Sequence, residues 1–167
     1  HVSGNLTDHY NPSNKTLNLS DSVYGSTSVA ASGVAAHECG HAVQHQVGYA
    51  PLSIRSALVP VANFGSSLSW PIFVAGLIFS IGPLLDIGII LFLAAVLFQV
   101  VTLPVEFNAS ARAIRLLDSC GILGQQEIGG TKKVLTAAAL TYVASLAASI
   151  LQLLRLLILA GGRRRND

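Results

Sequence analysis

Two long stretches of the chain carry almost no charged side chains. Between Ala57 and Val101 the only charged residue is Asp86, and between Val134 and Ala160 the only one is Arg155. As a helix with a rise of ~1.5 Å per residue, the first stretch would measure about 68 Å, enough for two crossings of a ~30 Å hydrocarbon core. The second would measure about 40 Å, enough for one tilted crossing. The pattern predicts three membrane-spanning helices, at about residues 57–80, 84–103 and 134–160.

Helix-breaking residues predict where these helices turn or end. The segment IGPLLDIG at residues 81–88 contains glycine, proline and a charged residue, so we expect the turn of a helical hairpin there. After the second span, Pro104 is expected to open a new helix, which Gly121 would close. The glycine-containing segment 122–133 is expected to be a loop before the last span.

The polar N-terminal part has a different pattern. Residues 5–20 hold two short stretches around the turn-rich NPSN, which predicts a small β-hairpin. Farther on, a serine or threonine at positions 26–28 can cap a helix that continues to Val47, because Gly48 is a natural C-terminal stop.

The composition favours lipid over water as the main solvent. Hydrophobic residues make up 51% of the 167 residues and charged residues only 11%, with a mean hydropathy of +0.59. Soluble domains usually have about 25% charged residues. The alternative, buried core helices of a soluble protein, conflicts with apolar runs of more than ~18 residues. We therefore expect a mostly α-helical integral membrane protein, with residues 1–167 as one membrane-embedded domain. Because the chain contains no methionine, an N-terminal part is expected to be missing.

One motif on the predicted N-terminal helix carries chemistry. In AAHECGHAVQH, His37 and His41 are four residues apart, so both imidazoles lie on one helix face and can each reach a zinc ion at about 2.0–2.1 Å. Glu38 neighbours the first histidine and can reach a water at the metal without ligating the metal itself, as a general base must. The alternative is that these are ordinary polar residues of a helix, which predicts no further ligand elsewhere.

A catalytic zinc site needs a third protein ligand, and two residues are candidates. His45 would complete an i, i+4, i+8 series, but on a straight helix it lies about 12 Å from His37 along the axis, too far for short bonds to one ion. Glu106 follows the second predicted span, and two crossings return the chain to the membrane face of the histidine helix. Glu106 is therefore the better candidate, although at a helix start it could instead stabilise the helix dipole.

Other polar residues have several possible roles. Asn108 and Ser110 share the helix of Glu106 and could orient a metal ligand, or they could be ordinary residues of a helix surface. Arg112 and Arg115 could stabilise an oxyanion, although arginines beside a span more often lie at the membrane interface. Each of these four residues therefore has two alternative roles.

Four segments together resemble a known family. LTDHYNP, SVAASGVAAHECGHAVQH, LVPVANFGS and LFQVVTLPVEFNASARAI are similar to the neutral zinc metallopeptidases of bacterial membranes, and HExxHxxQH combined with VEFNAS is more specific than HExxH alone. The resemblance implies a membrane-embedded, gluzincin-like peptidase. Its zinc ligands would be His37, His41 and Glu106. Its catalytic base would be Glu38. Membrane gluzincins often place an aspartate four residues after the ligand glutamate, and Ser110 departs from that pattern.

These residues predict a zinc-dependent hydrolase that cleaves peptide bonds in peptide or protein substrates, including membrane-associated ones. The alternative is a non-catalytic membrane protein that binds a metal or an assembly partner. A metal transporter would need more ionisable residues within the spans. A net charge of +2 is too slight to predict nucleic-acid binding.

Positive charges predict the orientation in a bacterial plasma membrane. Five lysines and arginines are expected on the side of the site and three on the other side, which favours a cytoplasmic active site. The two groups are Arg55, Arg112, Arg115, Lys132 and Lys133 for the first, and Arg163, Arg164 and Arg165 for the second.

Overall fold

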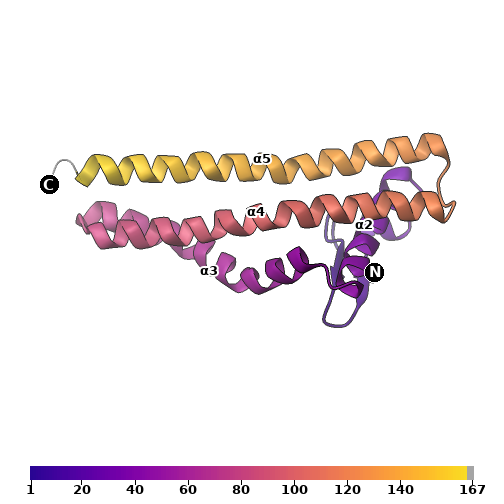
Figure 1. Cartoon of the computed structure of the whole chain (residues 1–167), viewed down its shortest axis with the longest axis horizontal. Helices are drawn as coiled ribbons and strands as arrows, with labels where there is room; N and C mark the ends of the chain where they lie inside the picture. Colours follow the sequence, from indigo (N-terminus) through magenta and orange to yellow (C-terminus); the bar gives the residue numbers. More distant parts are fainter. Residues whose placement is uncertain (165–167) are drawn as a thin grey trace. The chain divides into compact units, whose positions relative to one another are not determined.

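The structure, a computed structural model, describes residues 1–164, with side chains described through residue 162. Two strands come first, β1 (His9–Asn11) and β2 (Thr16–Asn18). Five helices follow in the described chain: α1 (Asp21–Tyr24), α2 (Val29–Gln46), α3 (Ala50–Phe79), α4 (Gly82–Ser119) and α5 (Gln125–Arg164) (Figure 1). The expected mostly α-helical class with a small N-terminal hairpin is confirmed.

The described chain forms two compact units, each with its own core. The first unit contains residues 1–53 and 103–141, and the second contains residues 54–102 together with the chain from residue 142 onward. The helices α3, α4 and α5 therefore each contribute to both units. All three residues predicted as metal ligands belong to the first unit.

In the first unit, local hydrogen bonds stabilise the two elements that the sequence predicted there, the β-hairpin and the helix α2. β1 and β2 pair antiparallel, with Tyr10 opposite Leu17. α2 follows the capping residue Ser28, whose hydroxyl accepts a hydrogen bond from the Ala31 N–H at 3.2 Å. The helix ends before Gly48, whose φ of +63° is a left-handed conformation that favours glycine. Both predictions for this part of the chain are confirmed.

Glycines bring α2 close to its neighbours in the same unit. A Cβ atom added to Gly40 would lie 2.4 Å from the backbone oxygen of Ala109 in α4. One added to Gly33 would lie 2.9 Å from Thr131 Cγ2 in α5. At Gly40 the facing atom is backbone, so the position has no room for a side chain. The buried core beside these contacts consists of Ala36, Ala113, Leu117 and Leu135.

In the second unit, α3 and the first half of α4 form the expected helical hairpin. The chain reverses at Ser80, which has a φ of +58°, immediately before the segment predicted to turn. A Cβ at Gly65 would lie 2.5 Å from the Leu91 backbone oxygen, and one at Gly88 would lie 2.8 Å from Phe73 Cβ. Small residues permit such close approach between membrane helices. The core of this unit consists of Phe73, Leu85, Leu156 and Ala160.

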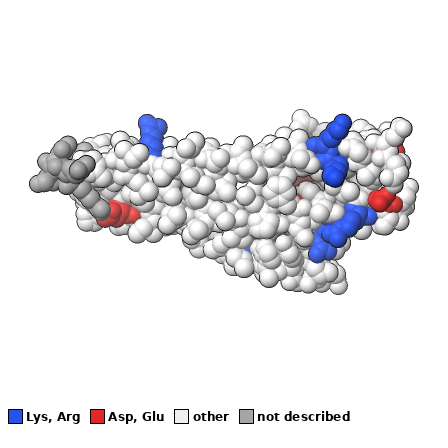
Figure 2. Space-filling view, turned by 45° about the horizontal axis from the view of Figure 1, so that its top comes forward, with Lys and Arg blue, Asp and Glu red and all other residues white. Residues whose placement is uncertain are grey.

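Among the described residues, three helices are long and apolar enough to cross a membrane: Ala50–Phe79, Gly82–Ser119 and Gln125–Gly162. Only 28%, 17% and 11% of their most apolar windows is buried inside the protein, so most of the apolar side chains face outward. Figure 2 shows one face of the molecule, most of which carries neither basic nor acidic side chains. Such a surface fits a lipid environment, in which hydrocarbon chains instead of water contact the apolar side chains that the protein does not bury.

Two predicted helix boundaries are wrong. Pro104 does not open a new helix but lies inside α4. Proline is tolerated within apolar helices where neighbouring groups satisfy the carbonyl that it leaves without a partner. The segment 122–133 is not a loop throughout, because α5 begins at Gln125. Ile128 in this segment packs against the core of the first unit, and Thr131 is fully buried. Such tertiary packing outweighs the low helix propensity of the neighbouring glycines.

Candidate metal centre

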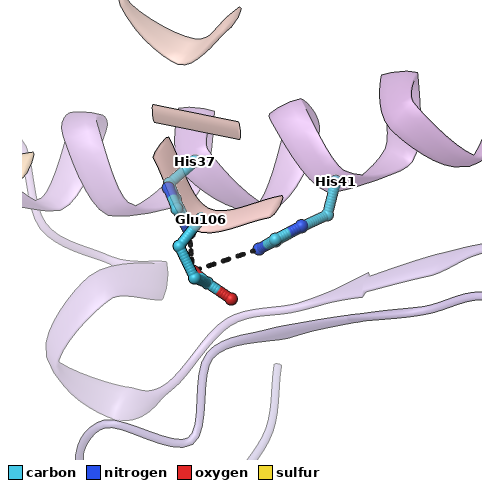
Figure 3. Close-up of side chains that lie close together, drawn as sticks. All are labelled: His37, His41 and Glu106. Carbon is cyan, nitrogen blue, oxygen red and sulfur yellow. Dashed lines mark hydrogen bonds and ion pairs between the residues drawn. The ribbon is translucent and has the colours of Figure 1, made fainter. Parts of the chain in front are cut away.

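Three side chains from α2 and α4 converge in the first unit. His37 and His41, one turn apart on α2, extend toward the carboxylate of Glu106 on α4 (Figure 3). The Nε2 atom of His37 lies 3.1 Å from Glu106 Oε2, and that of His41 lies 3.7 Å from the same oxygen. The close contact between Gly40 and Ala109 allows the two helices to approach this far. The structure thus brings together the three side chains that the sequence predicted as metal ligands.

These three donor groups suit a zinc ion. Their ligand atoms all lie within 4.8 Å of one another, and the ligand atoms of tetrahedral zinc lie about 3.3 Å apart when each bond is about 2.05 Å. Two imidazoles and one carboxylate are a known ligand set of catalytic zinc. The Glu106 side chain is only 3% exposed, and a buried carboxylate needs positive charge nearby. The residues present therefore fit the expected cofactor.

The second ring nitrogen of each histidine has a partner of its own. His37 Nδ1 lies 3.1 Å from Ser110 Oγ, and His41 Nδ1 lies 3.0 Å from Gln44 Oε1. Such contacts hold an imidazole in one orientation and leave Nε2 for a metal. Ser110, whose role the sequence left open, therefore contacts one of the candidate ligands.

Glu38 lies beside the cluster without being part of it. The residue is buried, and its Oε2 accepts a hydrogen bond from the backbone N–H of Tyr10 in β1 at 2.8 Å. This N–H donates to Glu38 and therefore points away from β2. The unpaired edge of β1 thus faces α2. The hairpin thus holds one oxygen of the carboxylate that the sequence predicted as the base.

Burial and charge act in opposite directions on the pKa of His41. Burial lowers this pKa, but the contact with the Glu106 carboxylate and its negative charge outweigh burial. Gln44 and Glu38 act in the same direction as Glu106, so the pKa of His41 lies above the usual imidazole value. Burial, and then the charge of Glu38, raises the pKa of the Cys39 thiol. A protonated thiol is a poor metal ligand, and Cys39 lies outside the cluster.

Other polar residues singled out in the sequence contact different partners. His45 is exposed, and its Nδ1 lies 2.8 Å from the Tyr10 hydroxyl. It does not join the metal-ligand cluster, as the reach of a straight helix predicts. Arg112 Nε donates to Asn108 Oδ1 at 2.8 Å, and Arg115 donates to a backbone oxygen of its own helix.

The alternative role of Glu106 as a helix-start residue is wrong. Glu106 lies well inside α4, which begins at Gly82. The favourable effect of a carboxylate on the helix dipole is confined to the first turn. The contacts with His37 and His41 explain the burial of this side chain instead.

Two contacts of the site were not predicted from the sequence. Gln44 follows His41 by three residues, a spacing that places both on one helix face and could have revealed their contact. Tyr10 lies 28 residues before Glu38, and no local pattern connects them. The first contact was therefore readable from helical periodicity, and the second was not.

Proteins with similar sequences are peptidases by name. Residues 1–161 match the family described as "Putative neutral zinc metallopeptidase". The chain is 48% identical over 166 residues to the protein named "Putative membrane protease YugP" of Bacillus subtilis (strain 168). That match covers 99% of this chain and 74% of the relative. No solved structure matches the chain.

Proposed function

The chain belongs to the family of neutral zinc metallopeptidases, and from this premise we propose that it binds Zn²⁺ and hydrolyses peptide bonds at the cluster of His37, His41 and Glu106. The observation that carries the proposal is the convergence of three ligand atoms within 4.8 Å. When bound, zinc would supply Lewis-acid polarisation of the attacking water and of the scissile carbonyl. The three side chains would hold the ion and leave its fourth position open.

Glu38 is the general base in this proposal. A carboxylate has two oxygens, and the Tyr10 N–H holds only Oε2, so Oε1 can take a proton from the attacking water. The water oxygen adds to the scissile carbonyl carbon. Glu38 then passes the proton to the nitrogen of the leaving amine as the peptide bond breaks.

The hairpin offers a place for an extended substrate beside this base. In an antiparallel pair, the N–H and C=O of one residue point in the same direction, so both backbone groups of Tyr10 lie on the outer edge of β1. The Tyr10 N–H is already bonded to Glu38, so the substrate is proposed to lie beside this edge with one of its own backbone N–H groups donating to the Tyr10 carbonyl oxygen. Such pairing fixes backbone geometry without demanding a particular sequence, so unfolded or membrane-associated segments suit it.

Residues 1–167 are further proposed to act as one domain in a bacterial plasma membrane, with the site on the cytoplasmic face. The excess of positive charge expected on the side of the site supports this orientation. Of the arginines counted on the opposite side, Arg165 lies outside the described residues. The side chains of Arg163 and Arg164 lie outside them too.

Replacing Glu38 by glutamine tests the proposed chemistry. Glu38→Gln removes the base but no ligand, so we expect the purified full-length chain to keep its zinc. Cleavage of an unfolded protein such as casein should fall by on the order of 10²–10⁴-fold. The matched control is Glu127→Gln, the same change at an exposed position of α5, which should cleave like the wild type.

Undiminished cleavage by Glu38→Gln would refute its role as the base. A wild-type protein that binds zinc but cleaves no peptide would favour the alternative, a non-catalytic metal-binding or assembly protein.

A further inference from the structure

A continuous run of hydrogen bonds connects Arg112 to His41. Arg112 Nε donates to Asn108 Oδ1 at 2.8 Å, and the same oxygen accepts from Gln44 Nε2 at 3.1 Å. Gln44 Nε2 also donates to the backbone oxygen of Val105 at 2.8 Å, and Gln44 Oε1 lies 3.0 Å from His41 Nδ1. Gln44 is fully buried, so its amide depends on these protein partners.

The partners on α4 determine which way the Gln44 amide faces. A backbone carbonyl only accepts hydrogen bonds, so the group that faces Val105 must be the NH₂ of the amide. An arginine only donates, so Asn108 must turn its oxygen toward Arg112, and this oxygen also accepts from the Gln44 nitrogen. Both constraints leave Gln44 Oε1 facing His41.

This orientation decides where His41 carries its hydrogen. An amide oxygen only accepts, so His41 Nδ1 must carry a hydrogen to form the contact. In the neutral ring the lone pair is then on Nε2, the atom that faces Glu106. The Ser110 hydroxyl beside His37 can either donate or accept, so it imposes no such choice on that ring.

We propose that Arg112, Asn108 and Gln44 form a positioning relay, which holds His41 in the tautomer that can bind a metal through Nε2. The inference rests on the proposed function, since this tautomer matters only if His41 binds zinc through Nε2. The relay also joins the two helices of the site, because Gln44 on α2 contacts the backbone of Val105, the residue before the third proposed ligand. It gives Arg112 and Asn108 one shared role that the sequence did not reveal.

The tautomer can be measured in the zinc-free, full-length protein. With nitrogen-15 in its histidines, in detergent micelles at a pH where the rings are neutral, the nitrogen shifts distinguish the ring nitrogen that carries hydrogen. We expect His41, assigned by the loss of its signals in His41→Asn, to carry hydrogen on Nδ1. Gln44→Leu should lose this preference. A wild-type His41 with its hydrogen on Nε2 would overturn the relay.

Zinc affinity, measured by competition with a chromogenic chelator, is the second readout. Gln44→Leu should weaken zinc binding by about 10-fold to 100-fold, the usual cost of losing an outer contact of a zinc ligand. Asn108→Leu should weaken it by about tenfold, at the low end of this range, because the Val105 carbonyl still holds the Gln44 amide. Asn108→Asp should bind zinc at least as tightly as the wild type, because the relay uses only the oxygen of this side chain. Gln46→Leu, the same change at an exposed position of α2, should match the wild type.

Wild-type affinity in both leucine variants at positions 44 and 108 would overturn the relay. If Gln44→Leu fails to fold, the contrast between Asn108→Leu and Asn108→Asp decides the question, because equal affinities of these two would also overturn it.

The two readouts separate the relay from the proposed function. If the wild type binds no zinc, the proposed function fails, whereas the tautomer of zinc-free His41 still supports or overturns the relay. If the wild type binds zinc and cleaves peptides but the Gln44 variant matches it in affinity and tautomer, the relay fails and the proposed function stands.

Discussion

The two nitrogens of each site histidine have separate contacts. At His37 and His41, Nε2 faces Glu106 and Nδ1 contacts a neighbouring side chain. If an imidazole were free to rotate, metal binding would have to offset the loss of that rotational freedom. Contacts at Nδ1 therefore affect zinc affinity even though they do not touch the ion.

Ser110→Ala tests the contact at His37. Removing the hydroxyl should weaken zinc binding by about tenfold, at the low end for such contacts, because the hydroxyl is neutral and the ring keeps its packing. Chelator competition measures this affinity. Ser119→Ala, the same change at an exposed position of α4, should keep the wild-type value. Equal zinc affinities of Ser110→Ala and the wild type would show that the ring does not need this partner.

The sequence predicted the three clustered residues but not the contacts around them. His37 and His41 could be predicted as members of the cluster because helical periodicity alone places them on one face. Glu106 could be predicted as the third member because a membrane hairpin returns the chain to the side of the membrane that holds the two histidines. The roles of Tyr10 and Gln44 depend on how the β-hairpin and α4 pack against α2. Local patterns carry no information about packing between such distant segments.

At the scale of secondary structure, the contact between α2 and α4 determines the geometry of the site. Gly40 precedes His41 in α2, and it faces Ala109, three residues after Glu106 in α4. Close approach of the two backbones at this point brings ligand atoms from both helices within reach of one ion. Gly40 therefore supports the site although it offers no ligand.

Gly40→Ala should disturb both the fold and the site. The added methyl group would lie 2.4 Å from a backbone oxygen, so α2 must move. We expect the free energy of unfolding to fall by about 1–3 kcal/mol, as in other overpacked cores, and zinc affinity to fall with it. Thermal unfolding in detergent, with and without zinc, measures both effects.

The matched control for this change is Gly129→Ala in α5, where a Cβ would meet nothing within 4 Å. It should be neutral or stabilising because alanine favours a helix. A Gly40→Ala protein as stable as the wild type would contradict the close packing of α2 on α4.

Helix-breaking residues were the least informative part of the sequence at this scale. Pro104 and the glycines of segment 122–133 predicted interruptions, yet α4 and α5 continue through them. Propensities measured in water weigh less where helices pack on one another or lie in an apolar environment. The cap at Ser28 was predictable from local capping chemistry. The hairpin was predicted near the correct place, but the chain reverses at Ser80, and Gly82, Pro83 and Asp86 of the predicted turn lie in α4.

At the scale of the whole molecule, the described chain combines a unit that holds the candidate site with a unit built from apolar helices. Three helices of this described part are long and apolar enough to cross a membrane, and most of their apolar surface is not buried by the protein. Their number and approximate positions could be predicted because long uncharged runs need no knowledge of tertiary contacts.

Thiol labelling tests the proposed orientation of the molecule. Cys120, just after α4, is exposed, and Cys39 is the only other cysteine of the chain. In a Cys39→Ser protein, a membrane-impermeant maleimide should label Cys120 in inverted vesicles but not in right-side-out vesicles. The reason is that the proposed orientation, based on the positive-inside rule, has this end of α4 in the cytoplasm. A protein without either cysteine controls for other labelling, and labelling confined to right-side-out vesicles would reverse the orientation.

The central claim is that a buried carboxylate of α4 completes a zinc site begun by two histidines of α2. The zinc affinity of Glu106→Gln, measured against the wild-type protein in detergent, tests it most directly. We expect the affinity to fall by more than about 100-fold, beyond the loss expected for an outer contact, while circular dichroism shows unchanged helix content. An unchanged zinc affinity would contradict the claim, because Glu106 could then not be a ligand.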